Sequence, residues 1–370
     1  MTDISAQRIQ DVISQFSLLG TCTNAERFGS GHIHDTFCLT YRHGSEQRRY
    51  VLQRINRQVF PDPPAVMENI VRVTRHVRHK LEVLGVPEVE RRVLTVVPTR
   101  GGAPCYVDRD GEFWRVYRRI EDAETHDVLV SLEQAYHAAR GFGEFQRLLL
   151  DLPAPPLIET LPRFHDGLTR YQALQVAVDT DSCGRMRRAA RDIAFVQGHA
   201  ELFQVIPRLL QAQSLPLRVT HNDTKINNVM LDSETGESIC VLDLDTVMPG
   251  VSVYDFGDIV RSSVSAAAED ERDLGQVVAE VSRFDALLRG FLDGIDGFLT
   301  SVERDHLVHG SILITLIIGT RFLTDYLNGD RYYKVQREGH NLDRCRAQFK
   351  LVESLMEQEE ILQSLVRRMA

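Results

Sequence analysis

The chain has 370 residues, 43% of them hydrophobic and 26% charged, which is the composition of an ordinary globular protein large enough for two lobes. Its formal net charge of −9 at pH 7 argues against a nucleic acid or an anionic membrane as the main partner, although a nucleotide needs only local donors and a metal. No secretory signal opens the chain, and the longest strongly apolar run, Ile312 to Ile318, is too short to cross a bilayer, so we expect a cytoplasmic protein.

The first 120 residues are rich in predicted strands, with one main helix among them. A glycine-containing turn at 43–45 separates two strand-like runs, which predicts a hairpin. Val66, Ile70, Val73 and Val77 recur on one helical face, which predicts an amphipathic helix. In chain order, the expected elements are strands at 37–41 and 49–54, the helix at 66–84, and strands at 93–97 and 113–117.

After Ile120 the pattern becomes mostly helical. Apolar residues from Leu132 to Leu149 recur at helical spacing, and helical patterns continue to Pro216. A strand, a turn and a second strand follow at 229–231 and 239–242, and the remainder is helical again. A small sheet lobe (1–120) followed by a larger helical lobe (121–370) predicts an α+β, protein-kinase-like fold of two lobes, with a ligand cleft between them.

One short stretch carries most of the predicted chemistry. His221 and Asp223 open a loop, Asn228 follows that aspartate by five positions, and Asp243 comes directly after the apolar strand at 239–242. Phosphoryl transfer needs such a set, because one carboxylate accepts the proton of a hydroxyl while two oxygen ligands hold Mg²⁺ on the phosphates of ATP. We therefore predict Asp223 as the catalytic base, Asn228 and Asp243 as metal ligands, Asp245 as a weaker second choice, and His221 as a brace for the loop.

The N-terminal lobe offers candidate ligands for the nucleotide. Gly29-Ser30-Gly31 precedes a strand and presents backbone N–H groups of the kind that cover phosphates. On the next strand, where kinases carry a lysine, this chain has Gln53 and Arg54, and Arg54 is a candidate source of positive charge. Glu68, on the following helix, is the candidate partner of that charge.

Asp255-Phe256-Gly257 contains the letters of the kinase metal motif, yet it lies far from Asp223 along the chain and follows no apolar strand. We expect an acid in this segment to accept hydrogen bonds from the backbone of the catalytic loop. Asp258 is accordingly assigned a structural role.

Together these residues resemble the aminoglycoside phosphotransferase and choline kinase superfamily, whose catalytic loop reads HxDxxxxN, and within it the N-acetylhexosamine 1-kinases. The likeness rests on four blocks that span nearly the whole chain, at 29–36, 220–228, 243–258 and 321–333. It implies phosphorylation of the anomeric hydroxyl of N-acetylglucosamine or N-acetylgalactosamine with ATP and Mg²⁺. It also implies that the sugar is held by His32, Asp223, Arg321, Tyr332 and Tyr333.

Two other functions remain open at this point. A related small-molecule kinase would act on an amino alcohol or an aminoglycoside, and the acidic or aromatic residues that such a cation needs are not located by the sequence. A catalytically silent nucleotide-binding protein is the third reading, which the presence of Asp223, Asn228 and Asp243 together argues against. The sequence does not indicate an oligomeric state.

Overall fold

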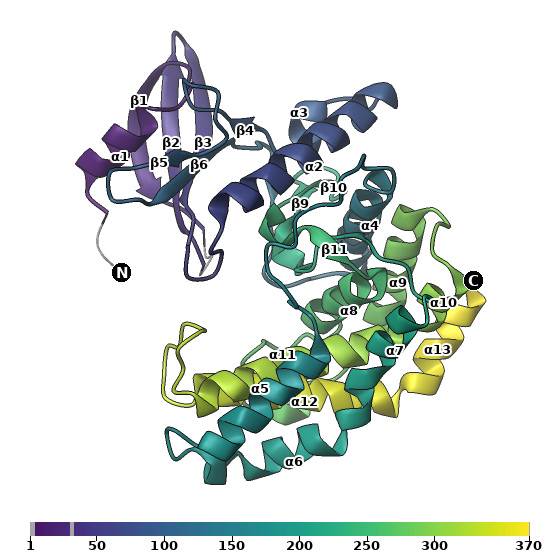
Figure 1. Ribbon diagram of the computed structural model, residues 1–370. Coiled ribbons are helices and arrows are strands. Elements are labelled where there is room, and N and C mark those ends of the chain that lie inside the picture. Colours follow the sequence, from purple (N-terminus) through teal and green to yellow (C-terminus); the bar gives the residue numbers. More distant parts are fainter. Residues whose placement is uncertain (1–3, 30–32, 370) are drawn as a thin grey trace. The chain divides into compact units, whose positions relative to one another are not determined.

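The computed structural model describes residues 4–29 and 33–369 (Figure 1). The chain divides into two compact units. The first unit comprises the residues up to Ala123 together with Asp151–Leu161 and Cys240–Val247, and the second comprises Glu124–Leu150, Pro162–Ile239 and the residues from Met248 onwards.

This division differs from the single boundary that we expected near residue 120, because two later segments join the first unit. Asn69, a buried residue of helix α2 (Pro63–Val83), holds both segments. Its amide nitrogen donates to the carbonyl oxygens of Ile158 (2.8 Å) and Val247 (3.3 Å), and its oxygen accepts the N–H of Ile158 (3.0 Å). Local sequence patterns do not reveal a side chain that forms hydrogen bonds with two segments distant in the chain.

The first unit is built on an antiparallel sheet with the strand order β1-β2-β3-β6-β4, to which β5 adds by pairing with β6 (Figure 1). The expected hairpin is confirmed as β2 and β3, whereas the strand expected at 93–97 is reduced to the two residues of β4. The strands are β1 (Thr21–Arg27), β2 (Asp35–His43), β3 (Glu46–Arg54), β4 (Val96–Val97), β5 (Tyr106–Val107) and β6 (Phe113–Arg118).

The two faces of this sheet differ in character because successive side chains along a strand point to opposite sides. One face carries Phe37, Leu39, Leu52 and Trp114, which form a core with the apolar side of α1 (Ala6–Ile13). In the register of the sheet, the neighbouring row consists of Thr36 on β2, Gln53 on β3 and Arg115 on β6. This second row therefore belongs to the opposite face, and it is polar.

Helix α2 begins as its sequence requires. The side chain of Asp62 accepts the N–H of Ala65, and prolines occupy the first two helical positions. The four valine and isoleucine side chains used to predict the helix are all buried. The short helix α3 (Val89–Arg92) follows.

The second unit is mainly helical, as expected. Its α-helices are α4 (Leu132–Leu148), α5 (Gly167–Thr180), α6 (Ala190–Gly198), α7 (Val205–Gln211), α8 (Ser252–Ser263), α9 (Val281–Ile295), α10 (Ser301–Asp305), α11 (Leu307–Leu327), α12 (His340–Glu357) and α13 (Glu359–Arg368). A small sheet accompanies them, formed by β8 (Arg218–Thr220) and β11 (Met248–Gly250). Another sheet has the order β10-β9-β7, formed by Ser238–Val241, Val229–Asp232 and Ala123–Glu124, and its strands β10 and β7 each include a boundary of the division.

Helix α11 is the centre of this unit. It alone among the helices of the described residues is long and apolar enough to span a membrane by length and composition, yet 78% of that stretch is buried, and it packs against α5, α8 and α12. Its approach to α8 is close: a Cβ atom added at Gly257 would lie 2.6 Å from the carbonyl oxygen of Gly310. Glycine at this crossing brings α8 against the core helix, and α8 in turn supports the loop after β8.

Candidate active site

One buried carboxylate holds the backbone of the loop after β8. Asp255, in the first turn of α8, accepts the backbone N–H groups of His221 and Asn222, each at 2.8 Å, and Gln146 of α4 donates to the same carboxylate at 2.6 Å. Burial raises the pKa of Asp255. The expectation that an acid of the Asp255–Asp258 segment binds the backbone of this loop is confirmed, and Asp255 is the acid that does so.

Asp223 projects from this loop and meets Asn228, which lies in the short 3₁₀ turn η3 (Ile226–Asn228). The amide nitrogen of Asn228 donates to Oδ2 of Asp223 at 2.9 Å and to its backbone carbonyl at 2.8 Å. Both amide hydrogens are thereby used, so the side-chain oxygen of Asn228 is the atom that remains for a cation. The spacing of five residues is what folds the amide back onto the carboxylate.

Positive charge beside Asp223 keeps it ionised. Lys225 Nζ lies 3.3 Å from Oδ1 of Asp223. Burial by itself raises the pKa of Asp223, but the charge of Lys225, followed by those of His221 and Arg261, opposes it, and the net effect lowers the pKa below its ordinary value. A carboxylate that is ionised at neutral pH is able to accept a proton from a substrate hydroxyl.

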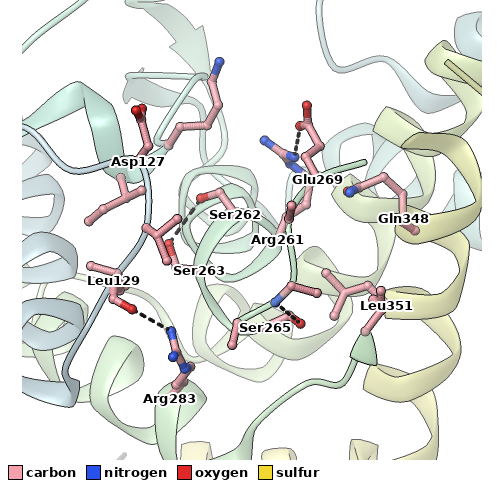
Figure 2. Close-up of a pocket in the computed structure, with 18 of the residues that line it drawn as sticks. Asp127, Leu129, Arg261, Ser262, Ser263, Ser265, Glu269, Arg283, Gln348 and Leu351 are labelled. Carbon is pink, nitrogen blue, oxygen red and sulfur yellow. Dashed lines mark hydrogen bonds and ion pairs between the residues drawn. The ribbon is translucent and has the colours of Figure 1, made fainter. Parts of the chain in front are cut away.

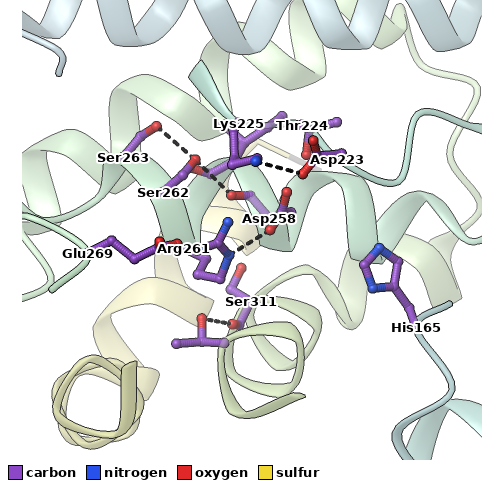
Figure 3. Close-up of polar contacts among 12 residues, drawn as sticks. His165, Asp223, Thr224, Lys225, Asp258, Arg261, Ser262, Ser263, Glu269 and Ser311 are labelled. Carbon is purple, nitrogen blue, oxygen red and sulfur yellow. Dashed lines mark hydrogen bonds and ion pairs between the residues drawn. The ribbon is translucent and has the colours of Figure 1, made fainter. Parts of the chain in front are cut away.

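Two further residues brace this group (Figure 3). Arg261 of α8 donates to Asp258 at 2.6 Å and to Glu269 at 3.0 Å, which agrees with the structural role expected of Asp258. His165 lies 2.7 Å from the carbonyl oxygen of Asn222, to which its Nε2–H donates. Burial lowers the pKa of His165 to about 4, so the imidazole is neutral at neutral pH and acts here as a hydrogen-bond donor to the loop.

In the first unit, the chain turns sharply after β10. Asp243 adopts a left-handed backbone conformation with φ of 53°, and the 3₁₀ turn η4 (Leu244–Thr246) follows. The strand therefore ends at Val241, before either carboxylate. Asp243 is exposed, whereas Asp245 is 2% exposed.

Asp245 is engaged on both oxygens. Arg115 of β6, also 2% exposed, binds it with both terminal nitrogens, one of them at 2.7 Å, and donates its Nε to Gln53 at 2.9 Å. Nε2 of His34 lies 2.6 Å from the same carboxylate. These contacts, with Arg115 foremost among the charges, outweigh the effect of burial and hold the pKa of Asp245 far below its usual range.

His34, Asp243 and Asp245 place potential metal-binding atoms within 4.8 Å of one another. However, Nδ1 of His34 accepts the backbone N–H of Asn56 at 3.1 Å, so the proton resides on Nε2 and is donated to Asp245. Neither ring nitrogen is then available to a metal. Carboxylate oxygen is the ligand that Mg²⁺ prefers, and Asp243 is the exposed carboxylate of this group.

Arg54 does not pair with Glu68, and that prediction is wrong. Its Nε donates to Asp35 at 3.0 Å, on the neighbouring strand and directly opposite in the register. Glu68 is exposed, whereas its neighbours on α2, Met67 and Asn69, are buried. Gln53 points to the polar face of the sheet, where its amide donates to Thr36 Oγ1 at 3.2 Å.

A separate cluster surrounds Arg321 of α11. Its guanidinium lies over three aromatic rings, those of Phe164 at 5.0 Å and of Tyr332 and Tyr333 at 5.8 Å each. Tyr332 and Tyr333 are held by backbone N–H groups that donate to Asp325 at 2.8 and 3.0 Å. The second unit thus brings together three residues that the resemblance assigns to the sugar.

A protein-family model described as the phosphotransferase enzyme family matches residues 24–292, which is most of the chain. The chain belongs to this family. Its fold is similar to that of an aminoglycoside phosphotransferase from Alicyclobacillus acidocaldarius, with 15% identity, a TM-score of 0.56, and coverage of 95% of this chain and 96% of that one. It is also similar to choline kinase from Cryptosporidium parvum, with 11% identity, a TM-score of 0.58, and coverage of 93% and 91%.

A third similar structure is spectinomycin phosphotransferase in complex with ADP and spectinomycin, with 12% identity, a TM-score of 0.54, and coverage of 97% of this chain and 100% of that one. At these identities the likeness concerns the fold. The predicted kinase-like α+β fold and the predicted membership in the phosphotransferase family are confirmed.

The predicted site residues of the phosphotransferase fall into two sets. Asp223, Asn228 and the Arg321 cluster lie in the second unit, whereas Gly29, Gln53, Arg54, Glu68 and Asp243 lie in the first. Ser30, Gly31 and His32 lie outside the described residues.

Three residues that matter at the site were missed. The sequence contains a feature that could have identified Arg115, because a charge interrupts the otherwise apolar and aromatic strand 113–117. Lys225 also had one, because it stands two residues after Asp223 in the loop. His165 had none, as 57 residues separate it from its partner Asn222.

Proposed function

We propose that this phosphotransferase uses ATP and Mg²⁺ to phosphorylate the anomeric hydroxyl of N-acetylglucosamine or N-acetylgalactosamine. The observation that carries the proposal is the Arg321 cluster. A guanidinium enclosed by the rings of Phe164, Tyr332 and Tyr333 offers planar donors to hydroxyl and carbonyl oxygens, beside aromatic surfaces that suit the C–H face of a sugar ring. This is the combination that a 2-acetamido hexose requires.

Asp223 is assigned as the base in this reaction. Its carboxylate is fixed by Asn228 and ionised beside Lys225, so it is able to orient the acceptor hydroxyl and to take its proton as the bond to phosphorus forms. Because phosphoryl transfer passes through a loose transition state, positioning of the hydroxyl is the larger part of this role. The hydrogen bonds from the loop to Asp255 and His165 serve that positioning.

The oxygen ligands fit Mg²⁺. The side-chain oxygen of Asn228 and the carboxylate of Asp243 are both hard donors of the kind that Mg²⁺ prefers. Mg²⁺ bound to ATP would neutralise charge on the transferred phosphoryl group. For the nucleotide, we assign Gly29-Ser30-Gly31 and Gln53 to phosphate binding, and His32 to the sugar. Arg54 points to the opposite face of the sheet, where it pairs with Asp35.

A cationic acceptor, such as an amino alcohol or an aminoglycoside, is the competing proposal. The charges around Arg321 oppose it. Arg170 of α5 lies near enough that, after burial, the charge of Arg321 is the next cause that lowers its pKa. The hydrogen bonds of Arg170 run to the backbone carbonyls of Arg163 and Phe164. This corner of the second unit therefore carries two guanidinium groups, and the charge of Asp166 acts on Arg170 less strongly than that of Arg321.

The test is an assay of ADP release from Mg-ATP with a panel of N-acetylhexosamines, hexoses, amino alcohols and aminoglycosides, followed by ³¹P and ¹H NMR to locate the phosphate. The expected result is turnover with N-acetylhexosamines and phosphate on C1. Phosphate at C6, or turnover confined to amines, would refute the proposal.

Two variants sharpen this assay. Asp223→Asn should lower kcat by about 10²- to 10⁴-fold, the range for loss of a general base, while Mg-ATP still raises the thermal midpoint of the variant. Arg321→Met should raise KM for the sugar by about tenfold without a matching loss of ATP binding. The controls are Asp179→Asn on the exposed side of α5 and Arg331→Met, both of which should behave as the parent protein.

A further inference from the structure

The second unit contains a pocket beside the catalytic loop, and the Arg321 cluster is not among the residues that line it. It has a volume of about 250 Å³ and is lined by the Lys225–Asn227 segment, by the end of α8 and the loop that follows it, and by Gln348 and Leu351 of α12 (Figure 2). Lys225 joins the pocket to the proposed base, since its Nζ lies 3.3 Å from Oδ1 of Asp223. Ala266, Ala268 and Glu269 on its rim are exposed, so the pocket is open to solvent.

The positive charges that line the pocket are compensated. Each of its cationic side chains has an acidic partner, which argues against an anionic ligand. Of its two carboxylates, Glu269 is held by Arg261, and Asp127 accepts a hydrogen bond from the amide of Asn227. The pairs are Lys225 with Asp223 (3.3 Å), Arg261 with Glu269 (3.0 Å), and Arg283 with Glu280 (3.0 Å), and Asn227 donates to Asp127 at 3.2 Å.

The hydrogen-bond acceptors of the pocket favour a ligand with hydroxyl donors. Gln348 is 4% exposed, and within the described part of the chain its Oε1 has no hydrogen-bond partner. The same holds for Oδ1 of Asn227. Amide oxygens accept hydrogen bonds, and leaving such groups unsatisfied in a buried place is costly, so both are suited to the O–H groups of a ligand. The hydroxyls of Ser262 and Ser263 lie on the same wall (Figure 2).

The remaining lining is small and apolar, with Ala266, Ala267, Val277 and Leu351. A surface that combines hydroxyl acceptors with small apolar side chains fits the two faces of a sugar ring. We propose that this pocket is a second carbohydrate subsite, which takes a neutral sugar ring joined to the hexosamine whose anomeric hydroxyl is phosphorylated. The proposal rests on the proposed function and names its substrate class as a short oligosaccharide.

The pocket and the Arg321 cluster are connected through a short series of contacts. Glu269, on the pocket rim, lies 3.8 Å from Arg344, whose guanidinium stands over the ring of Phe322 at 5.5 Å. Phe322 packs against Tyr333 with ring centroids 4.7 Å apart. The pocket rim and the Arg321 cluster are therefore linked by side-chain contacts within one unit.

The test compares kcat/KM for N-acetylglucosamine with that for neutral disaccharides that carry N-acetylglucosamine at the reducing end and a hexose on O3, O4 or O6. The expected result is a gain of about tenfold or more for at least one linkage. In Gln348→Leu that gain should fall by about tenfold, the size of one neutral hydrogen bond, with the monosaccharide unaffected. Ala267→Phe, which places a large side chain in the lining of the pocket, should abolish the gain.

Gln363→Leu on α13, which is not among the residues lining the pocket, is the matched control and should keep the gain. Turnover of the monosaccharide with no gain from any second ring would overturn the subsite and leave the proposed function standing. Equal losses for monosaccharide and disaccharide in both pocket variants would also overturn it. Absence of turnover with every sugar would overturn the proposed function together with the subsite.

Discussion

Replacing Asp245 by Asn tests whether the buried ion pair with Arg115 fixes the turn that carries Asp243. The side chains of Arg115 and Asp245 are 2% and 1% exposed, and the carboxylate receives two guanidinium nitrogens and the Nε2–H of His34. Asn keeps the shape but removes the charge, and its amide nitrogen cannot accept either hydrogen bond. The guanidinium of Arg115 is then left buried without a counter-charge.

Breaking a buried pair on one side destabilises a protein by about 3–5 kcal/mol. With a urea dependence of about 2 kcal/mol per M, the unfolding midpoint of the first unit should fall by about 2 M. Trp114, the only tryptophan of the chain, is fully buried on β6 next to Arg115, so its fluorescence reports the unfolding of this unit alone. The measurement is a urea titration of metal-free protein followed at the tryptophan emission maximum.

Two further variants make the reasoning refutable. The double variant Arg115→Met, Asp245→Leu should recover most of the lost stability, because two apolar side chains replace the pair without leaving a buried charge. Glu46→Gln removes an exposed pair with Arg48 on the same sheet and should leave the midpoint unchanged within error. A shift below about 0.3 M for Asp245→Asn, or a double variant no more stable than the single one, would show that the pair does not hold this turn.

Two other predictions concern the second unit. Asp255→Asn replaces one of the two oxygens that accept the N–H groups of His221 and Asn222 by a hydrogen-bond donor. In the ADP-release assay, kcat should therefore fall by about a hundredfold with little change in Mg-ATP binding. An unchanged kcat would contradict the bracing role of Asp255. Glu303 is fully buried and binds Arg218 at 2.7 and 2.8 Å; burial alone raises its pKa, but Arg218 lowers it on balance. That lowered pKa means that the stability from the pair is present above about pH 4.3 and is lost as the pH falls further. At pH 7, Glu303→Gln should therefore lower the urea midpoint of the helices, measured by far-ultraviolet circular dichroism. Near pH 3, the midpoint of the variant should approach that of the parent protein. A difference between the two midpoints that does not depend on pH would contradict the predicted pH dependence.

Most elements with a strong local pattern could be predicted from the sequence. The hairpin of β2 and β3, helix α2 and helix α4 were recognised because alternation or helical spacing of apolar residues depends only on neighbours along the chain. The strand at 93–97 was overestimated, because just Val96 and Val97 find a partner on β6. Pairing across a sheet decides how long a strand is, and apolar residues alone do not.

The candidate site shows the same limit. The contact between Asp223 and Asn228 spans five residues, so the spacing already contained it. Arg115 and Asp245 are separated by 130 residues, and the pairing of Arg54 with Asp35 depends on the register of two strands. The sequence named the acids and the arginines of the first unit but matched Arg54 with Glu68, which the structure places on an exposed helix face.

The sequence by itself determined the chemistry: a loop with a carboxylate and an amide at the spacing of a phosphotransferase, a second carboxylate after an apolar strand, and the family to which the chain belongs. The tertiary structure alone decided which cation neutralises which acid, and it engages the carboxylate of Asp245 with Arg115 and His34. It also decided that Gln348 faces a pocket beside the catalytic loop. The physical reason is that chemistry resides in single side chains, whereas charge pairing and burial depend on segments that meet only when the chain folds.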